Sequence, residues 1–169
     1  MLGLLPALPP GLASVALGFG QREGPNLSGI YAVGDNPVID VLLPADEADG
    51  SLWVALADVT GDLYNLLPNI NRPDSALADA ATVADGMRRV RVAFSRAEAA
   101  EDPKRLWFTI DDTFGKSVVI VFLTDRPLFA ELRPTTESVE GFAEDLAQVL
   151  QAGQVDIRSI ATQFIDSRG

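Results

Sequence analysis

Histidine and cysteine are both absent from this sequence of 169 residues. Without an imidazole or a thiol, the chain cannot form a Ser-His-Asp triad, a Cys-His pair, a thiolate metal site or a histidine-based pH switch. Disulfides are excluded as well, so cysteine usage permits any redox compartment. The chemistry that remains belongs to carboxylates, lysine, arginine, hydroxyls and the backbone, which serve binding modules as readily as enzymes.

Basic residues are also few, with 13 Lys and Arg against 24 Asp and Glu, a net charge of −11. A chain of this charge is repelled by phosphate backbones and anionic lipid surfaces, so we expect neither nucleic acid nor a membrane surface as a partner. The length predicts one domain that buries roughly 70% of the surface of the unfolded chain. The hydrophobic fraction of 47% predicts a packed core.

The amino terminus lacks a basic region, because Leu2 to Gly20 carries no charge. Pro6, Pro9 and Pro10 interrupt this apolar run, which is therefore not typical of a secretory signal. Its proline-free remainder is shorter than the ~20 residues that a transmembrane helix needs. We expect residues 1–13 to be a proline-rich lead or linker and residues 14–169 to be a single β-sandwich domain. From the abrupt Met-Leu-Gly start we expect the chain to be a piece of a longer one.

Alternating apolar residues predict a series of short strands. The predicted strands cover residues 14–19, 38–43, 51–57, 63–67, 89–94, 105–110, 116–124, 129–132 and 155–164. Residues 51–57 are apolar on both faces, which is typical of a strand covered on both sides. Gly61 gives the segment Asp58 to Asp62 the chemistry of a hairpin turn. The expected core positions are Val15, Leu17, Val54, Leu56, Val90, Val92, Val119 and Val121.

A helical period replaces the strand alternation at residues 137–151, where Val139, Phe142, Leu146, Val149 and Leu150 recur at helical spacing. We expect Thr135 or Thr136 to cap this helix and Gly153 to end it. Residues 95–104 are expected to form a short helical turn. The predicted fold is mainly β, an antiparallel immunoglobulin-like β-sandwich with one C-terminal amphipathic helix. The helix is expected to lie on its own sandwich, the alternative being the rest of the parent protein or a second copy.

The candidate binding residues lie in one polar loop, Asn69, Asn71, Arg72 and Asp74, which we expect to be exposed and open to a ligand or partner. A structural role, in which the loop turns the chain at the end of a strand, is favoured over binding. For three other clusters we favour a structural interpretation over a functional one. Asp46, Glu47 and Asp49 are expected to form a solvated turn rather than a calcium loop, and Asp111 and Asp112 a turn rather than a catalytic acid pair. Arg88, Arg89 and Arg91 are expected to form ion pairs within the chain rather than bind an acidic partner.

The aromatic residues Trp53, Trp107, Tyr31 and Tyr64 are expected to fill the core or cover a sheet face, the alternative being a ligand shelf. The glycines form no phosphate-binding loop, because no GxxxxGK[ST] sequence is present. We therefore expect no catalytic residues, no metal site and no cofactor.

Several short segments follow one another in a specific order along the middle of the chain. They are Tyr31-Ala32-Val33-Gly34-Asp35, Ser51-Leu52-Trp53-Val54-Ala55-Leu56, Gly61-Asp62, Leu66-Leu67-Pro68-Asn69, and Val118 to Thr124 with Asp125-Arg126-Pro127-Leu128. In this order they resemble the bacterial domain-of-unknown-function family 4384 over about 100 residues, the usual size of one domain. The resemblance implies an immunoglobulin-like accessory domain beside serine/threonine kinase, caspase-like peptidase or nucleotide-cyclase domains, or in envelope proteins. It implies no catalytic residues.

The resemblance and the missing catalytic residue types predict a non-enzymatic interaction or sensing module, part of a larger bacterial signalling or effector protein. Its expected partner is an adjoining domain of that protein or another protein, and a periplasmic or extracytoplasmic location is favoured over the cytoplasm. Two alternatives stay open. A hydrolase or glycan-active enzyme would need two convergent carboxylates in a cleft, whereas a structural spacer of an envelope assembly would have neither a cleft nor a specific ligand.

Overall fold

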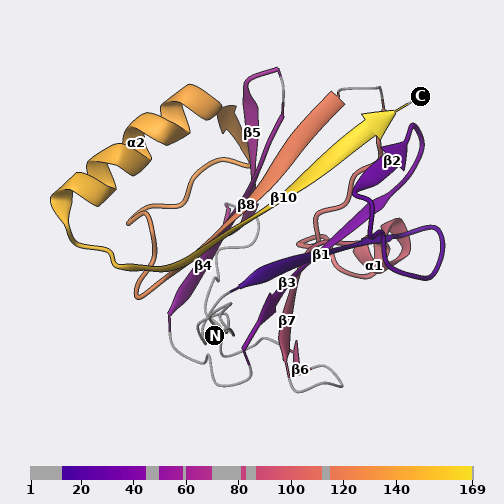
Figure 1. Cartoon of the computed structure of the whole chain (residues 1–169), viewed down its shortest axis with the longest axis horizontal. Coiled ribbons are helices and arrows are strands. Elements are labelled where there is room, and N and C mark those ends of the chain that lie inside the picture. The colour runs from indigo at the N-terminus through magenta and orange to yellow at the C-terminus, as the bar shows by residue number, and fades with distance from the viewer. Residues whose placement is uncertain are drawn as a thin grey trace, which may run out of the picture.

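The computed structural model describes residues 13–44, 50–58, 60–69, 81–82, 87–111 and 115–168. In this part of the chain, two β-sheets and two helices make up a mainly β fold, as predicted (Figure 1). In chain order the elements are β1 (Ser14–Phe19), β2 (Ile30–Ala32), β3 (Pro37–Leu43), β4 (Ser51–Ala57), β5 (Asp62–Leu67), β6 (Ala81–Thr82), β7 (Arg88–Ala93), α1 (Arg96–Glu101), β8 (Gly115–Thr124), β9 (Thr136–Ser138), α2 (Val139–Ala152) and β10 (Ile157–Arg168).

The strands form a small sheet in the order β1-β3-β7-β6 and a large sheet in the order β2-β10-β8-β4-β5-β9. The hairpin predicted from Gly61 joins β4 and β5, which pair antiparallel. The described strands pair antiparallel, as predicted, except that β2 runs parallel to β10. The chain reaches β2 through a loop held by a hydrogen bond from the Asp166 N–H to the Gly29 carbonyl (2.8 Å), and this fixes β2 along the end of β10.

The two sheets pack face to face through one apolar cluster, to which both contribute alternate residues. The predicted core is confirmed: six of its positions are buried, and Val15 and Val90 pack half-buried against the cluster. The six are Leu17, Val54, Leu56, Val92, Val119 and Val121. Ala13 is also buried in this cluster, and its N–H donates to the Ser159 hydroxyl (3.1 Å), so this residue of the predicted lead belongs to the core.

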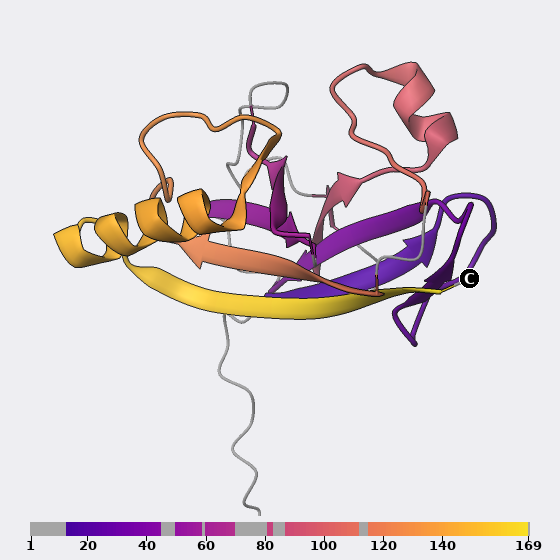
Figure 2. The same cartoon turned by 90° about the horizontal axis from the view of Figure 1, so that it is seen from above.

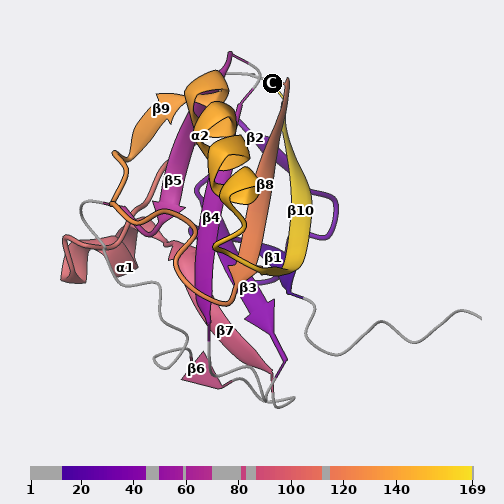
Figure 3. The same cartoon turned by 90° about the vertical axis from the view of Figure 1, so that its left-hand side faces the viewer.

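The second face of the large sheet is covered by α2, which lies across β4 in Figure 3. Trp53 of β4 contacts the Phe129 ring edge to face at 4.9 Å between centroids, and Phe129 contacts Phe142 of α2 in the same way at 5.3 Å. Val139, Leu146 and Val149 complete the covered side of the helix. The prediction that the helix lies on its own sheets is therefore confirmed, and so is the burial of β4 on both faces.

A network of polar side chains connects the start of α2 to the large sheet. Asn65 of β5 is fully buried, accepts a hydrogen bond from the Trp53 indole N–H (2.9 Å), and donates to Glu137 (2.6 Å). Glu137 in turn accepts from Arg133, which also pairs with Asp145 of α2 (2.8 Å). Among the described residues, no buried side-chain nitrogen or oxygen lacks a hydrogen-bond partner, as burial requires.

The capping residue of α2 differs from the prediction. Ser138, rather than Thr135 or Thr136, accepts a hydrogen bond from the Gly141 N–H (3.0 Å), because residues 136–138 pair with β5 as strand β9 and delay the helix start. Gly153 ends the helix at a φ of 68°, in the left-handed region that glycine adopts without strain, as predicted.

Two predicted strands are wrong, because residues 105–110 and 129–132 form none. In the first segment the backbone bonds go to separate neighbours: the Phe94 N–H donates to Leu106 O (2.9 Å), and the Ile110 N–H donates to Asp35 O (2.9 Å). In the second, Phe129 packs beneath α2, so burial of that ring takes the place of strand pairing. The predicted short helix is α1, and Figures 1 and 2 show it at the opposite end of the molecule from α2.

Candidate functional site

The predicted binding loop is described only at its first residue. Asn69 is 3% exposed, and its side-chain amide donates to the carbonyl oxygens of Asn65 (2.8 Å) and Leu66 (3.4 Å). The expectation that Asn69 is exposed is wrong, because its amide bonds the backbone where the chain leaves β5. Asn71, Arg72 and Asp74 lie outside the described residues, as do Asp46, Glu47, Asp49 and Asp112, so binding by the loop stays a prediction.

The aromatic residues of the predicted core separate into two pairs. Trp53 and Tyr31 are buried, and the Tyr31 hydroxyl donates to the Gly18 carbonyl (2.7 Å). Tyr64 is half-buried and Trp107 is 41% exposed, and both face a hollow of about 620 Å³, here called the aromatic hollow. The core interpretation is therefore confirmed for Trp53 and Tyr31, and Trp107 lies at the surface.

The aromatic hollow lies on the face of the large sheet that meets the small sheet, at an end that the small sheet does not line among the described residues. Its base comes from alternate residues of neighbouring strands, whose side chains share one face because strands have a period of two. These residues are Leu56 of β4, Tyr64 and Leu66 of β5, Ser117 of β8, Ile165 and Ser167 of β10, and Thr136 of β9.

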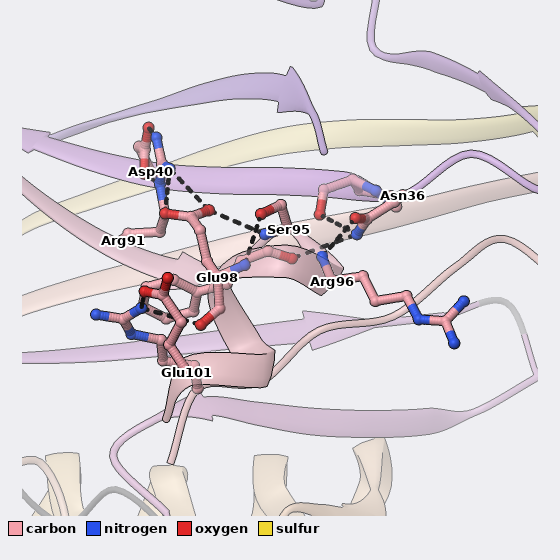
Figure 4. Close-up of polar contacts among 10 residues, drawn as sticks. Asn36, Asp40, Arg91, Ser95, Arg96, Glu98 and Glu101 are labelled. Atoms are coloured by element: carbon pink, nitrogen blue, oxygen red, sulfur yellow. Dashed lines mark hydrogen bonds and ion pairs between the residues drawn. The ribbon is translucent and has the colours of Figure 1, made fainter. Parts of the chain in front are cut away.

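The irregular segment 106–111 forms the opposite side of the hollow and contributes Trp107 and Phe108. Asn36 holds this segment: its amide donates to the Phe108 carbonyl (3.0 Å) and the Phe94 carbonyl (3.3 Å). The Arg96 N–H donates to the amide oxygen of the same Asn36 (2.9 Å), in a cluster drawn in Figure 4. One buried side chain thus positions the segment that carries Trp107.

Carboxylates lie around the opening of the hollow. In the β4–β5 turn, Asp58 Oδ1 accepts from the Thr60 hydroxyl (2.5 Å), the Thr60 N–H (2.9 Å) and the Asp62 N–H (3.2 Å). From the other side, Asp111 accepts from the Thr109 hydroxyl (3.1 Å). Burial, assisted by Asp58 and Asp62, raises the pKa of Tyr64, which therefore remains a neutral phenol.

A second hollow, of about 660 Å³, lies on the outer side of the small sheet around Arg91. Arg91 of β7 bonds Asp40 of β3 through two nitrogens (2.8 and 3.0 Å) and Glu98 of α1 (2.9 and 3.0 Å), as Figure 4 shows. The hydrogen bond to Asp40 is the largest of the causes that raise the pKa of Arg91. The prediction of intramolecular pairing is confirmed for Arg91, and this cluster joins α1 to two strands.

Sequence reasoning missed the site, although it named several of its residues for other reasons. The sequence places Tyr64 and Trp107 in the core or on a sheet face, Asp58 and Asp62 in a hairpin turn, and Asp111 with Asp112 in a second turn. The hairpin turn is confirmed and Tyr64 packs half-buried against the core, whereas Trp107 is exposed in a segment that forms no strand. Nothing in the alternation of polar and apolar residues indicates that these segments meet, because the contact depends on hydrogen bonds that the segment carrying Trp107 forms with Asn36 and Asp35, far away in the sequence.

Comparisons of the chain with protein-family models, with curated proteins and with solved structures found no match. Within the described ranges, no three Asp or Glu side chains gather closely enough to hold a metal ion. Neither helix of the described chain is long and apolar enough to cross a membrane.

Proposed function

We propose that this chain is a non-enzymatic interaction or sensing module and that its ligand or partner binds in the aromatic hollow. The single observation that carries the proposal is the placement of Tyr64 and Trp107 in one hollow of about 620 Å³. Ligand sites are typically concave, of 300–1,000 Å³, and mostly apolar with a few polar groups.

The construction of the hollow supports the proposal further. Leu56, Leu66 and Ile165 belong to the main core, so the base is held by the same packing that holds the two sheets together. A site supported by strands is positioned more rigidly than one made of loops alone. Hydroxyls of Thr60, Thr109 and Thr136 add hydrogen-bonding groups at its edge.

Nuclear magnetic resonance can test the proposal, because the chain has two tryptophans and only Trp107 lines the hollow. A library of fragments and short peptides is titrated while the two indole N–H signals are followed. We expect binders to shift the signal of Trp107, whereas that of Trp53, 1% exposed, stays unchanged. The proposal is wrong if no library member shifts the Trp107 signal, or if binders shift only signals of residues outside the hollow.

Three variants locate the binding. Tyr64→Ala removes a ring from the hollow, and Thr136→Phe fills space from an exposed strand position while leaving the core intact. Both should weaken binding. Phe164→Ala is the matched control, since Phe164 is 59% exposed and is not among the residues that line the hollow. Equal loss of binding in the control would contradict the proposal.

A carboxylate-based hydrolase or glycan-active enzyme is the second candidate. The observation that favours it is that Asp62 and Asp111, from separate segments, line the same hollow as two aromatic rings. This candidate requires that Asp62→Asn and Asp111→Asn each abolish hydrolysis of a glycan. A structural spacer, the third candidate, is supported if neither binding nor hydrolysis is found.

We also propose that the two sheets form an immunoglobulin-like sandwich of the domain family 4384, acting as an accessory domain of a bacterial signalling or effector protein. The ordered segments from Tyr31 to Leu128 support this proposal. An experimental structure of an established member of that family tests it directly. A different strand order from that of the small and large sheets would overturn the family assignment.

A further inference from the structure

The charged side chains described along the aromatic hollow are all acidic. Asp58, Asp62 and Asp111 all line it, and no Lys or Arg is among the described residues that do so. None of these three carboxylates forms an ion pair with a described basic side chain. A ligand bound here therefore meets negative charge that no cation among the described lining residues offsets, which favours a positively charged group.

The aromatic rings favour the same charge. The faces of tyrosine and tryptophan rings carry partial negative charge and attract ammonium and guanidinium groups. The Trp107 ring already has one such contact, from the Arg96 guanidinium at 5.3 Å from the ring centroid, and Arg96 does not line the hollow. Lys116, the neighbour of Ser117, is close to the ring of Phe164, which does not line the hollow either.

The lining of the hollow also favours a ligand with an apolar part. Leu106 and Phe108, both half-buried, present apolar surface in the hollow, and the buried Leu56, Leu66 and Ile165 support it from below. A small inorganic cation would leave this surface in contact with water, whereas a ligand with an apolar body would cover it. The lining thus matches an amphipathic cation.

We propose that the aromatic hollow binds an ammonium or guanidinium group attached to an apolar body, with the cation at Asp62 and Asp111 and the body on the apolar base. The group can belong to a lysine or arginine of a partner peptide or to a free organic amine. This inference rests on the proposed binding function and specifies its ligand.

Matched probes of equal shape and different charge test the inference. 4-Phenylbutylamine is compared with 4-phenylbutanol, and the peptide acetyl-Leu-Arg-Leu-amide with its citrulline analogue, with the Trp107 indole signal as the readout. Each cation should bind at least roughly fivefold more tightly than its neutral counterpart, the effect of one opposite charge a few ångströms away in a water-like medium. Raising the salt concentration should weaken the binding of the cationic probes and leave that of the neutral probes unchanged.

Asp62→Asn and Asp111→Asn keep the size of the side chain and remove its charge. Each substitution should weaken the binding of the cationic probe by roughly fivefold and leave the affinity of the neutral probe unchanged. Glu144→Gln is the control for net charge, because Glu144 is exposed on α2 and does not line the hollow. Asp58 is not used, since its Oδ1 holds the turn.

The outcomes separate the two proposals. Tighter binding of the amine than of the peptide identifies the ligand as a small molecule, and tighter binding of the peptide identifies it as a protein partner. Both results support the inference. Equal binding of charged and neutral probes, or an equal effect of Glu144→Gln, overturns the inference but leaves the binding function standing. If no probe and no library member shifts the Trp107 signal, both proposals are wrong.

Discussion

Replacing Phe142 with alanine removes the ring that joins α2 to the large sheet. The side chain is 4% exposed and lies 5.3 Å from the ring of Phe129 and 6.5 Å from that of Phe122. Truncating a buried phenylalanine to alanine costs about 3–5 kcal/mol in unfolding free energy, from lost burial and the cavity left behind. Each aromatic pair contributes about 0.5–1.5 kcal/mol of this loss beyond the buried area.

For a chain of this length, such a loss corresponds to a fall in Tm of roughly 6–20 °C, at about 2–4 °C per kcal/mol. Urea unfolding followed by tryptophan fluorescence measures the change in free energy, because one of the two tryptophans, Trp53, is buried under the same helix. Leu150→Ala is the matched control on α2: Leu150 is 43% exposed, so its truncation should cost about 0.5 kcal/mol or less.

The reasoning is refuted if Phe142→Ala unfolds at the same urea concentration as the control. A variant of unchanged stability that loses self-association in gel filtration would identify α2 as an interface between molecules. Phe142→Asp places a charge in the same apolar contact and should unfold the chain or destabilise it more than alanine does.

Two further predictions concern the polar contacts. Asn36→Ala should lower the unfolding free energy by about 3 kcal/mol, because it leaves buried carbonyls without donors. Hydrogen exchange should rise first in residues 106–111, and unchanged exchange there would contradict the assigned role. The other prediction concerns the stability of the fold at low pH. Burial raises the pKa of Glu137, but hydrogen bonds from Arg133 and Asn65 outweigh this and hold the pKa below its ordinary value of 4.5. A lowered pKa stabilises the fold above about pH 4.5, and the contribution is lost as the pH falls through the folded-state pKa. Glu137→Gln should therefore be less stable than the parent chain at neutral pH and lose less stability as the pH falls below about 4.5, as measured by urea unfolding; parallel pH profiles would refute the assignment.

The sequence by itself determined the local structure wherever one physical pattern was repeated. Alternation located β1, β4 and most of β8, and the two apolar faces of residues 51–57 indicated that β4 would be covered on both sides. Helical spacing located α2 and its covered side, and Gly61 and Gly153 marked a turn and a helix end. These features depend on neighbours a few residues apart, so the order of side chains is sufficient to predict them.

Only the tertiary structure decided which strands pair and what lies between them. The apolar residues of segment 105–110 looked like a strand, but Asn36 and Asp35 bond its backbone separately and turn it into one side of the aromatic hollow. Tyr64 and Trp107 are 43 positions apart in the sequence, and they line one hollow because hydrogen bonds with Asn36 and Asp35 hold the segment that carries Trp107. Alternation specifies which side chains share a face of a strand. It does not specify the neighbouring strand, because backbone hydrogen bonds are the same for every residue type except proline.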